Sequence, residues 1–184
     1  MGLGRGPVLL YNGQEVGEVA AEAEGFGGGG GRSSIFDYGS MPGLARWVNG
    51  HRYDGGHSTE EERVLRDRYR RLLRALTHEA LCGGDFIPLN GANVQNPEFG
   101  RLPGEPASGH WTYAYLRASV HCPRPVMVVA NLHPSEGGRP LSVWLTESAS
   151  EAVRRVVAGN RVRFRDLLGG MPDFELGWDE SHRV

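Results

Sequence analysis

The residues best suited to contact a ligand lie in the stretch PVLLYNGQEVGE, which spans positions 7–18. It opens with an apolar run without polar alternation, which predicts a strand buried on both faces, as in parallel sheets flanked by helices. The polar residues that follow would emerge at the carboxyl end of this strand, where parallel α/β folds and barrels place their ligands. The simpler alternative is a short core strand followed by an ordinary polar turn. The predicted binding residues are Tyr11, Asn12, Gln14 and Glu15, together with Arg32 further along the chain.

Four acidic residues in this half of the chain are candidates for a general acid–base pair: Glu15, Glu18, Asp37 and Asp54. Such a pair needs two neighbouring carboxyl groups, one ionised and the other held protonated by its surroundings. Glu15 and Glu18 are close enough in sequence to approach each other, but their loop offers no apolar enclosure that would raise either pKa. We therefore predict no catalytic pair among them.

Metal-binding and nucleophilic sites have weaker support. His51, Asp54 and His57 recur at spacings of three, but they lie in a glycine-rich turn with no fourth ligand in view. Zinc sites need three or four well-held ligands, so turn and capping roles are the default for these residues. No serine lies in the Gly-x-Ser-x-Gly pattern of hydrolase nucleophiles. We expect no catalytic residues, no metal and no cofactor.

Composition narrows the classes of partner. The 184 residues carry a formal net charge of -2, so bulk charge gives no reason to expect nucleic acid or an anionic membrane. No apolar run approaches the roughly 20 residues needed to cross a bilayer, and the N-terminus lacks a signal-peptide pattern. Cys82 and Cys122 are too few for a disulfide scaffold. They favour two reduced thiols in a cytoplasmic protein, although a bridge between them stays open.

Two helices are predicted in the first half of the chain. A short one begins at Pro42, with Ser40 as its cap and Asn49-Gly50 at its end. A longer one begins at a capping box formed by Ser58 and Glu61 and runs to about residue 78. Arginines interleaved with acidic residues on its surface favour local ion pairs in solvent over a nucleic-acid stripe. Its apolar residues recur at helical spacing: Leu65, Tyr69, Leu72, Leu73, Leu76 and Ala80.

Short strands between turns are predicted after Gly83, which places a domain boundary there and divides the chain into residues 1–83 and 84–184. Strands joined by turns, without helices to cover both faces, indicate an antiparallel β-sandwich. Trp111, Tyr113 and Tyr115 alternate on one side of a strand, where core packing is the default and a sugar platform the alternative. No element is predicted for residues 171–184. The predicted strands are 86–89, 111–116, 126–132, 141–145 and 162–167, with a helix at 151–157.

Several motifs occur in a fixed order along residues 7–168. LLYNGQEVGE contains Tyr11, Gly13 and Glu15, and it is followed by GRSSIFDY, by MPGLARWVNG with the capped helix, and by WTYAYLR and VMVVANLH. In this order they resemble the C-terminal part of the α-amylase superfamily of glycoside hydrolases. The first is similar to the Tyr-x-Gly-x-Glu motif of the last strand of that family's (β/α)8 barrel. The next two resemble the loop after this strand and the closing helix, and the last two resemble strands of the C-terminal antiparallel domain.

The resemblance implies an α+β chain, in which the final strand and helices of a (β/α)8 barrel precede an antiparallel β-sandwich domain. It also implies carbohydrate metabolism, with an α-glucan or small α-glucoside as partner. The family's aspartate nucleophile, glutamate acid/base and second aspartate lie on earlier strands, upstream of Met1, and a full barrel takes about 250 residues. We therefore expect a truncated hydrolase that is inactive alone, with the missing barrel half supplied by another chain if at all.

The side-chain chemistry of the predicted binding residues suggests a role for each of them. Tyr11 would stack on a sugar, and Asn12 would form paired hydrogen bonds with it. Gln14 and Glu15 would hold the loop at the strand end, and Arg32 would orient a nearby carboxylate. Two other interpretations stay open: a non-catalytic carbohydrate-binding or interaction module built on the sandwich, and a truncated reading frame whose product is only marginally stable.

Overall fold

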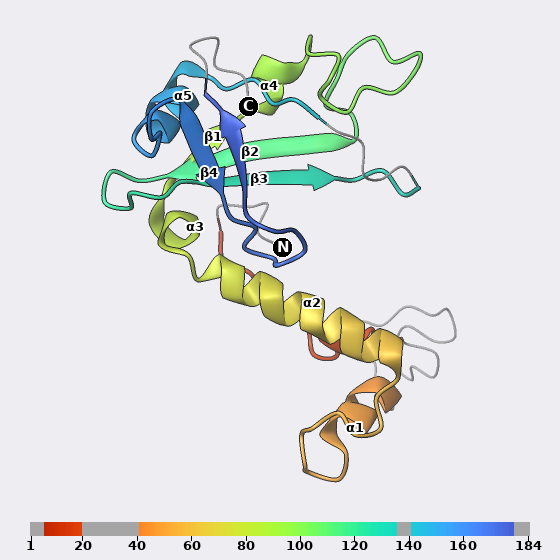
Figure 1. Ribbon diagram of the computed structural model, residues 1–184. Coiled ribbons are helices and arrows are strands. Elements are labelled where there is room, and N and C mark those ends of the chain that lie inside the picture. Colours follow the sequence, from red (N-terminus) through yellow and green to blue (C-terminus); the bar gives the residue numbers. More distant parts are fainter. Residues whose placement is uncertain (1–5, 20–40, 136–140, 179–184) are drawn as a thin grey trace. The chain divides into compact units, whose positions relative to one another are not determined.

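The structure, a computed structural model, describes residues 6–19, 41–135 and 141–178 (Figure 1). The described residues form helices, one three-stranded antiparallel sheet and one two-stranded antiparallel sheet, which confirms the predicted α+β class. The chain divides into two compact units, Met1–Arg74 and Ala75–Val184.

The first unit contains a one-turn 3-10 helix, η1 (Gln14–Val16), and the helices α1 (Pro42–Val48) and α2 (Glu60–Leu76), whose last two residues belong to the second unit. The strand predicted at residues 8–10 is not formed. Leu9 is 89% exposed, and residues 7–11 pair with none of the described strands. A strand is stabilised by hydrogen bonds to a neighbouring strand. Because no described segment supplies them, the prediction of a strand is wrong here.

The start of α1 depends on a residue far away in sequence. Pro42 occupies the first turn, as predicted, where its missing amide hydrogen costs nothing. The cap position is Met41 and not the predicted Ser40, which lies outside the described residues. The Met41 side chain accepts no capping hydrogen bond. The carboxylate of Glu18 accepts one instead, from the amide of Leu44 at 2.9 Å. The negative charge also complements the positive end of the helix dipole.

The capping box of α2 lies one residue later than predicted. Glu62 Oε2 accepts a hydrogen bond from the Thr59 amide at 2.9 Å, and Thr59 Oγ1 accepts one from the Glu62 amide at 3.3 Å. The predicted pair was Ser58 with Glu61. The sequence Ser-Thr-Glu-Glu-Glu satisfies the capping pattern both with Ser58 and Glu61 and with Thr59 and Glu62. Arg46 favours the later pair, because it binds the Glu62 carboxylate through two nitrogens.

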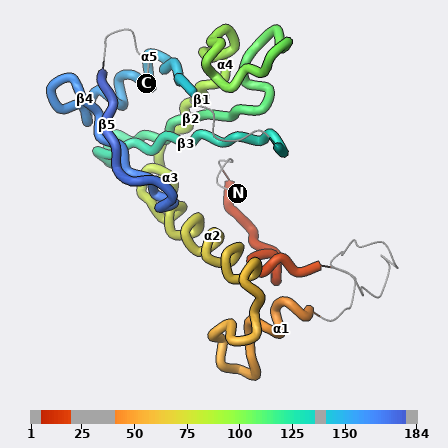
Figure 2. Tube along the Cα trace, turned by 45° about the vertical axis from the view of Figure 1, so that its right-hand side comes forward, coloured from red at the N-terminus to blue at the C-terminus, as the bar shows by residue number. Residues whose placement is uncertain are grey.

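The three-stranded sheet of the second unit has the order β1-β2-β3 (Figure 2). Leu116 of the central strand lies opposite Ile87 on one side and Met127 on the other. These three side chains pack in the main core, because residues opposite each other in a sheet point to the same face. Three predicted strands are formed with small shifts in their bounds: β1 (Asp85–Pro88), β2 (Thr112–Ala118) and β3 (Val126–Asn131).

The other elements of the second unit depart more from prediction. α5 (Glu147–Arg154) begins four residues before the predicted helix, because the Thr146 hydroxyl accepts a hydrogen bond from the Ala149 amide at 3.3 Å. β4 (Arg161–Phe164) pairs with β5 (Phe174–Gly177), where no element was predicted. Both sheets are antiparallel, as expected, and their packing as a sandwich stays a prediction. The unit also contains two short helices, α3 (Glu79–Gly83) and α4 (Asn90–Asn93).

Residues 141–145, predicted as a strand, are held instead by buried asparagine side chains. Asn93 donates to the Trp144 carbonyl at 2.9 Å and accepts from the Trp144 amide at 2.8 Å. Asn96 donates to the Ser142 carbonyl at 2.8 Å and to Asn93 Oδ1 at 2.9 Å. Both asparagines are at most 1% exposed. The side-chain amides of Asn93 and Asn96 therefore form the hydrogen bonds with the backbone of this segment that a neighbouring strand would otherwise form. These bonds anchor the segment against the core.

We predict that Asn93→Ala lowers the free energy of unfolding by about 3 kcal/mol, because it leaves buried partners such as the Trp144 amide unsatisfied. Gln95→Ala is the matched control, because Gln95 is exposed two residues away. Urea unfolding followed by circular dichroism measures both variants. A loss below about 1 kcal/mol for Asn93→Ala would show that the buried network is not a main source of stability.

Candidate functional site

The stretch predicted to carry the site is a compact turn. η1 lies between Gly13, with φ 85°, and Gly17, with φ 69°, and glycine is the residue that adopts this left-handed conformation without strain. The Gly13 carbonyl accepts hydrogen bonds from the amides of Val16 and Glu18 at 3.1 and 3.0 Å. A Cβ atom at Gly13 would lie 2.7 Å from the Met41 Cε atom, so the turn packs closely against the residue before α1.

Four of the five predicted binding residues lie on this turn. Tyr11 is 49% exposed, and the side chains of Asn12 and Gln14 are also exposed. Gln14 Oε1 accepts a long hydrogen bond of 3.4 Å from the Tyr11 amide, so this side chain bridges the turn. Glu15 is half-buried. The structure therefore brings these four residues together, and Arg32 lies outside the described residues.

Arg66 of α2 joins the turn to α1. Its guanidinium carbon lies 3.7 Å from the centre of the Trp47 ring. Its NH1 atom lies 3.8 Å from the Glu15 carboxylate. The ring and the carboxylate both attract the cation, and each contact is worth about 1 kcal/mol or less where side chains are partly solvated. Arg66 is thus paired with the one acidic residue among the predicted binding residues.

A hollow of about 540 Å³ opens beside these residues, within the first unit. Its volume is in the range of small-molecule sites, which combine apolar and aromatic walls with a few polar groups. An indole ring, a phenol ring and charged side chains of both signs border the hollow, and Arg66 covers one face of the indole. It is lined by Leu10, Glu15, Trp47, Arg63, Arg66, Asp67, Tyr69, Arg70 and Leu73.

A second ion pair holds α1 against α2. Arg46 Nε donates to Glu62 Oε1 at 3.0 Å, and NH2 of the same guanidinium binds the same carboxylate. The hydrogen bond from Arg46 is the main cause that lowers the pKa of Glu62 below its ordinary value. Because Glu62 also accepts the capping bond from Thr59, one carboxylate both starts α2 and binds α1.

The acidic candidates for catalysis are occupied by structural contacts. Glu18 accepts the hydrogen bond that starts α1, and Glu15 is paired with Arg66. Asp54 accepts hydrogen bonds from Asn49 Nδ2 at 2.7 Å and from the Gly56 amide at 2.9 Å. The bond from Asn49 is the main cause that lowers the Asp54 pKa. Asp37 lies outside the described residues.

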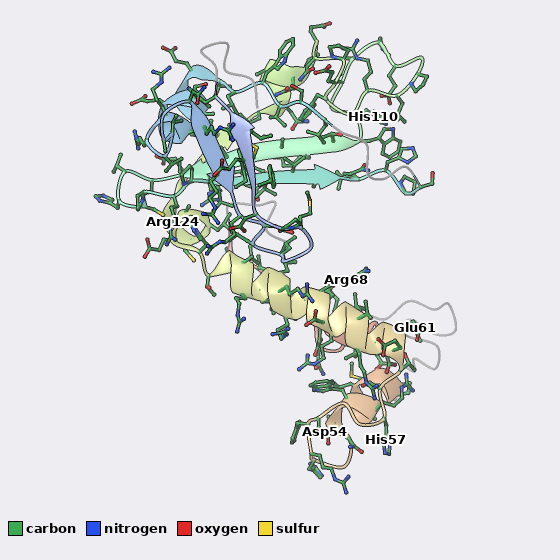
Figure 3. The ribbon with its side chains drawn as sticks, in the orientation of Figure 1. Asp54, His57, Glu61, Arg68, His110 and Arg124 are labelled. Carbon is green, nitrogen blue, oxygen red and sulfur yellow. The ribbon has the colours of Figure 1, made fainter. Side chains whose placement is uncertain are left out.

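The histidine and aspartate candidates for a metal site lie on the loop between α1 and α2. Figure 3 labels Asp54 and His57 on this loop. Among the residues that the structure describes, no group of three histidine, cysteine or acidic side chains could hold a metal ion. Asp54 has the turn role that was the default for it, because it accepts hydrogen bonds from Asn49 and Gly56.

The aromatic row predicted on the central strand is formed in the second unit. The rings of Tyr113 and Tyr115 are 5.9 Å apart, and Tyr115 stacks on Phe86 at 4.6 Å. Trp111 contacts the rings of His110 and His133 edge to face at 4.6 and 4.7 Å. Tyr115 is fully buried, whereas Trp111 and Tyr113 are half-buried. Core packing therefore accounts for one end of the row, and the other end reaches solvent.

Sequence reasoning missed the contribution of Trp47, Arg66 and Tyr69 to the hollow. Tyr69 was assigned to the apolar face of the long predicted helix and the arginines of that helix to its solvated surface, while Trp47 was given no role. Nineteen positions separate Trp47 from Arg66, and neither belongs to a local motif. Only the packing of α1 beside α2 brings them together, so no local signal could have identified them.

Comparisons with known proteins give no relative for this chain: no family model, no curated protein and no solved structure matches it. Among the described residues, no helix has the length and apolar character needed to span a membrane. Cys82 is exposed and Cys122 is buried, and the two are not bridged. The function must therefore be inferred from the site itself and from the order of the motifs.

We predict that Glu62→Gln lowers the free energy of unfolding at pH 7 by about 1 to 2 kcal/mol, because it weakens charge-assisted hydrogen bonds. The folded pKa of Glu62 is lowered, so this stabilisation is present above the unfolded value of about 4.5 and is lost as pH falls through the folded pKa. Urea unfolding at several pH values measures it.

Glu60→Gln is the matched control, because Glu60 is an exposed glutamate in the same first turn. The difference between the wild type and Glu62→Gln should shrink once the pH falls below about 4.5. A difference that stays constant from pH 7 to pH 3 would contradict the assigned role of the carboxylate.

Proposed function

We propose that this chain is a partial α-amylase-type glycoside hydrolase that binds an α-glucan or small α-glucoside and does not hydrolyse it alone. The order of its motifs supports this assignment, from LLYNGQEVGE to VMVVANLH. The observation that carries it is the exposure of the apolar run at residues 8–10. This run precedes the turn formed by residues 11–18, which we call the Tyr11 turn. Nucleic acid and membranes are not expected partners, and the proposed setting is cytoplasmic.

The apolar run has the composition of a buried strand, but no described segment covers Val8 and Leu9. Val8 is 45% exposed and Leu9 is 89% exposed, while Leu10 lines the hollow. Full burial of a leucine side chain stabilises the folded state by about 1.5 to 3 kcal/mol. Leu9 gains little of this stabilisation, because it is exposed. On α2, Leu73 is 40% exposed as well. Such residues fit a surface that neighbouring strands and helices of a barrel would cover, which supports a role within a larger assembly.

The Tyr11 turn supports sugar binding more than catalysis. Its tyrosine ring and asparagine amide are exposed together, and rings of this kind stack on the apolar face of a sugar. The adjoining hollow adds Trp47 and Tyr69. The carboxylates of Glu15 and Glu18 are engaged by Arg66 and by the Leu44 amide. Under this proposal the chain orients a glucoside, and the reactive acids come from elsewhere in the assembly.

A second candidate function is a non-catalytic carbohydrate-binding module that uses the aromatic row of the second unit. The contacts of Trp111 with His110 and His133 favour it, because they hold a half-buried indole in place at one end of β2. A fixed, partly exposed aromatic ring is a suitable platform for a sugar. The two candidates place the ligand on different units of the chain and can therefore be separated.

We predict that the purified chain binds maltoheptaose but releases no reducing sugar from starch, maltose or sucrose. Calorimetric titration measures binding, and a reducing-sugar assay measures hydrolysis. Tyr11→Ala should weaken binding about three- to tenfold, because it removes one stacking surface. Trp111→Ala is the matched aromatic variant in the second unit and should leave binding unchanged.

Loss of binding on Trp111→Ala with normal binding by Tyr11→Ala would replace the first candidate with the second. Release of reducing sugar that disappears in Glu15→Ala would overturn the assignment of inactivity. Absence of any binding of maltoheptaose would contradict both candidates.

A further inference from the structure

The loop between α1 and α2 is held in an unfavourable backbone conformation. Five of its seven residues at positions 49–55 have positive φ, and three of these are not glycine. Asn49 has φ 45°, which matches its predicted role at the end of α1. His51 has φ 70° and Tyr53 has φ 56°, a region in which the Cβ atom of an ordinary side chain is crowded. Glycine at these two positions would relieve that crowding.

The loop is nevertheless firmly fixed by the rest of the first unit. The Tyr53 amide donates to the Val48 carbonyl at 3.0 Å, and the Gly55 amide donates to the Trp47 carbonyl at 3.1 Å. Gly55 also lies against the Trp47 ring, because a Cβ atom there would be 2.5 Å from Cζ3. Nearby, the Ser58 hydroxyl is buried without a hydrogen-bond partner among the described residues. Two unfavourable features thus occur close together: the positive φ angles of His51 and Tyr53, and the buried Ser58 hydroxyl without a partner among the described residues. Such features are expected where a protein gives up stability for binding.

The conformation displays two rings to solvent. Tyr53 is 61% exposed, and its ring centre lies 6.4 Å from that of His51, with 60° between the ring planes. Asp54 is the only acidic residue at positions 49–57, and its carboxylate is taken up by Asn49 and Gly56. The rings therefore offer stacking surfaces, ring nitrogens and a phenol hydroxyl beside the exposed Arg52, without a free carboxylate next to them. This chemistry suits a neutral polyhydroxylated ring.

We propose that His51 and Tyr53 form a second glucan-binding site in the first unit, separate from the Tyr11 turn. The inference rests on the proposed binding of α-glucans by this chain. Trp47 connects the two sites, because its ring contacts Gly55 of the loop and also holds Arg66, which pairs with Glu15. A glucan long enough to span the two sites would gain from both, and a single glucoside would occupy only one of them.

The test is calorimetric titration of the full chain with maltoheptaose, using Tyr53→Ala, Tyr53→Gly and His57→Ala. Both substitutions of Tyr53 should weaken binding about three- to tenfold, because both remove the ring. Tyr53→Gly should also be more stable than Tyr53→Ala, with an unfolding constant roughly fivefold smaller, because glycine tolerates φ 56°. His57→Ala, an exposed change in the same loop, should alter neither affinity nor stability.

The outcomes separate this site from the Tyr11 site. Normal maltoheptaose affinity of Tyr53→Ala, with weakened affinity of Tyr11→Ala, would overturn the second site and leave the proposed function in place. Weakened affinity of both variants supports the two sites. Absence of maltoheptaose binding by the wild type would overturn both. Circular dichroism spectra of the variants establish that a loss of affinity does not arise from unfolding.

Discussion

The cation of Arg66, held between the Trp47 ring and the Glu15 carboxylate, joins the three described elements of the first unit. These contacts link η1, α1 and α2, whose other connections include the Glu18 bond to the start of α1 and the pair of Arg46 with Glu62. Among the described residues of this unit few apolar side chains are fully buried, so charged contacts carry much of the organisation seen there. A unit built in this way keeps polar groups next to half-exposed rings, a combination found in small-molecule sites.

The second unit is stabilised differently. Buried residues of β2, α5 and β4 share one apolar core, and the side chains of Asn93 and Asn96 attach residues 141–145 to it. Buried amides that are fully bonded stabilise a specific chain path, because any other path would leave them unpaired. The two units therefore differ in what stabilises them: buried apolar packing in the second, and charged contacts between the described elements in the first.

The sequence predicted the features that depend on neighbouring residues and missed those that depend on distant ones. Pro42 and Asn49 marked the ends of α1 because helix ends have local signals. The capping register of α2 was ambiguous in sequence, and Arg46 decides it from another helix. Alternation at 141–145 predicted a strand, but asparagine side chains take its hydrogen bonds. Val8–Leu10 has a strand's composition and lacks the neighbour that would make it one. The candidate residues Tyr11 to Glu15 were placed on one turn, whereas Trp47 and Arg66 join them only through helix packing.

The central claim is that the Tyr11 turn binds a glucan. Hydrogen–deuterium exchange of the full chain with and without maltoheptaose tests it directly, because a bound ligand slows the opening of the segment it contacts. We expect slower exchange at the amides of residues 11–18 when maltoheptaose is present. Unchanged exchange at these amides under saturating maltoheptaose, with slower exchange confined to the second unit, would contradict the account.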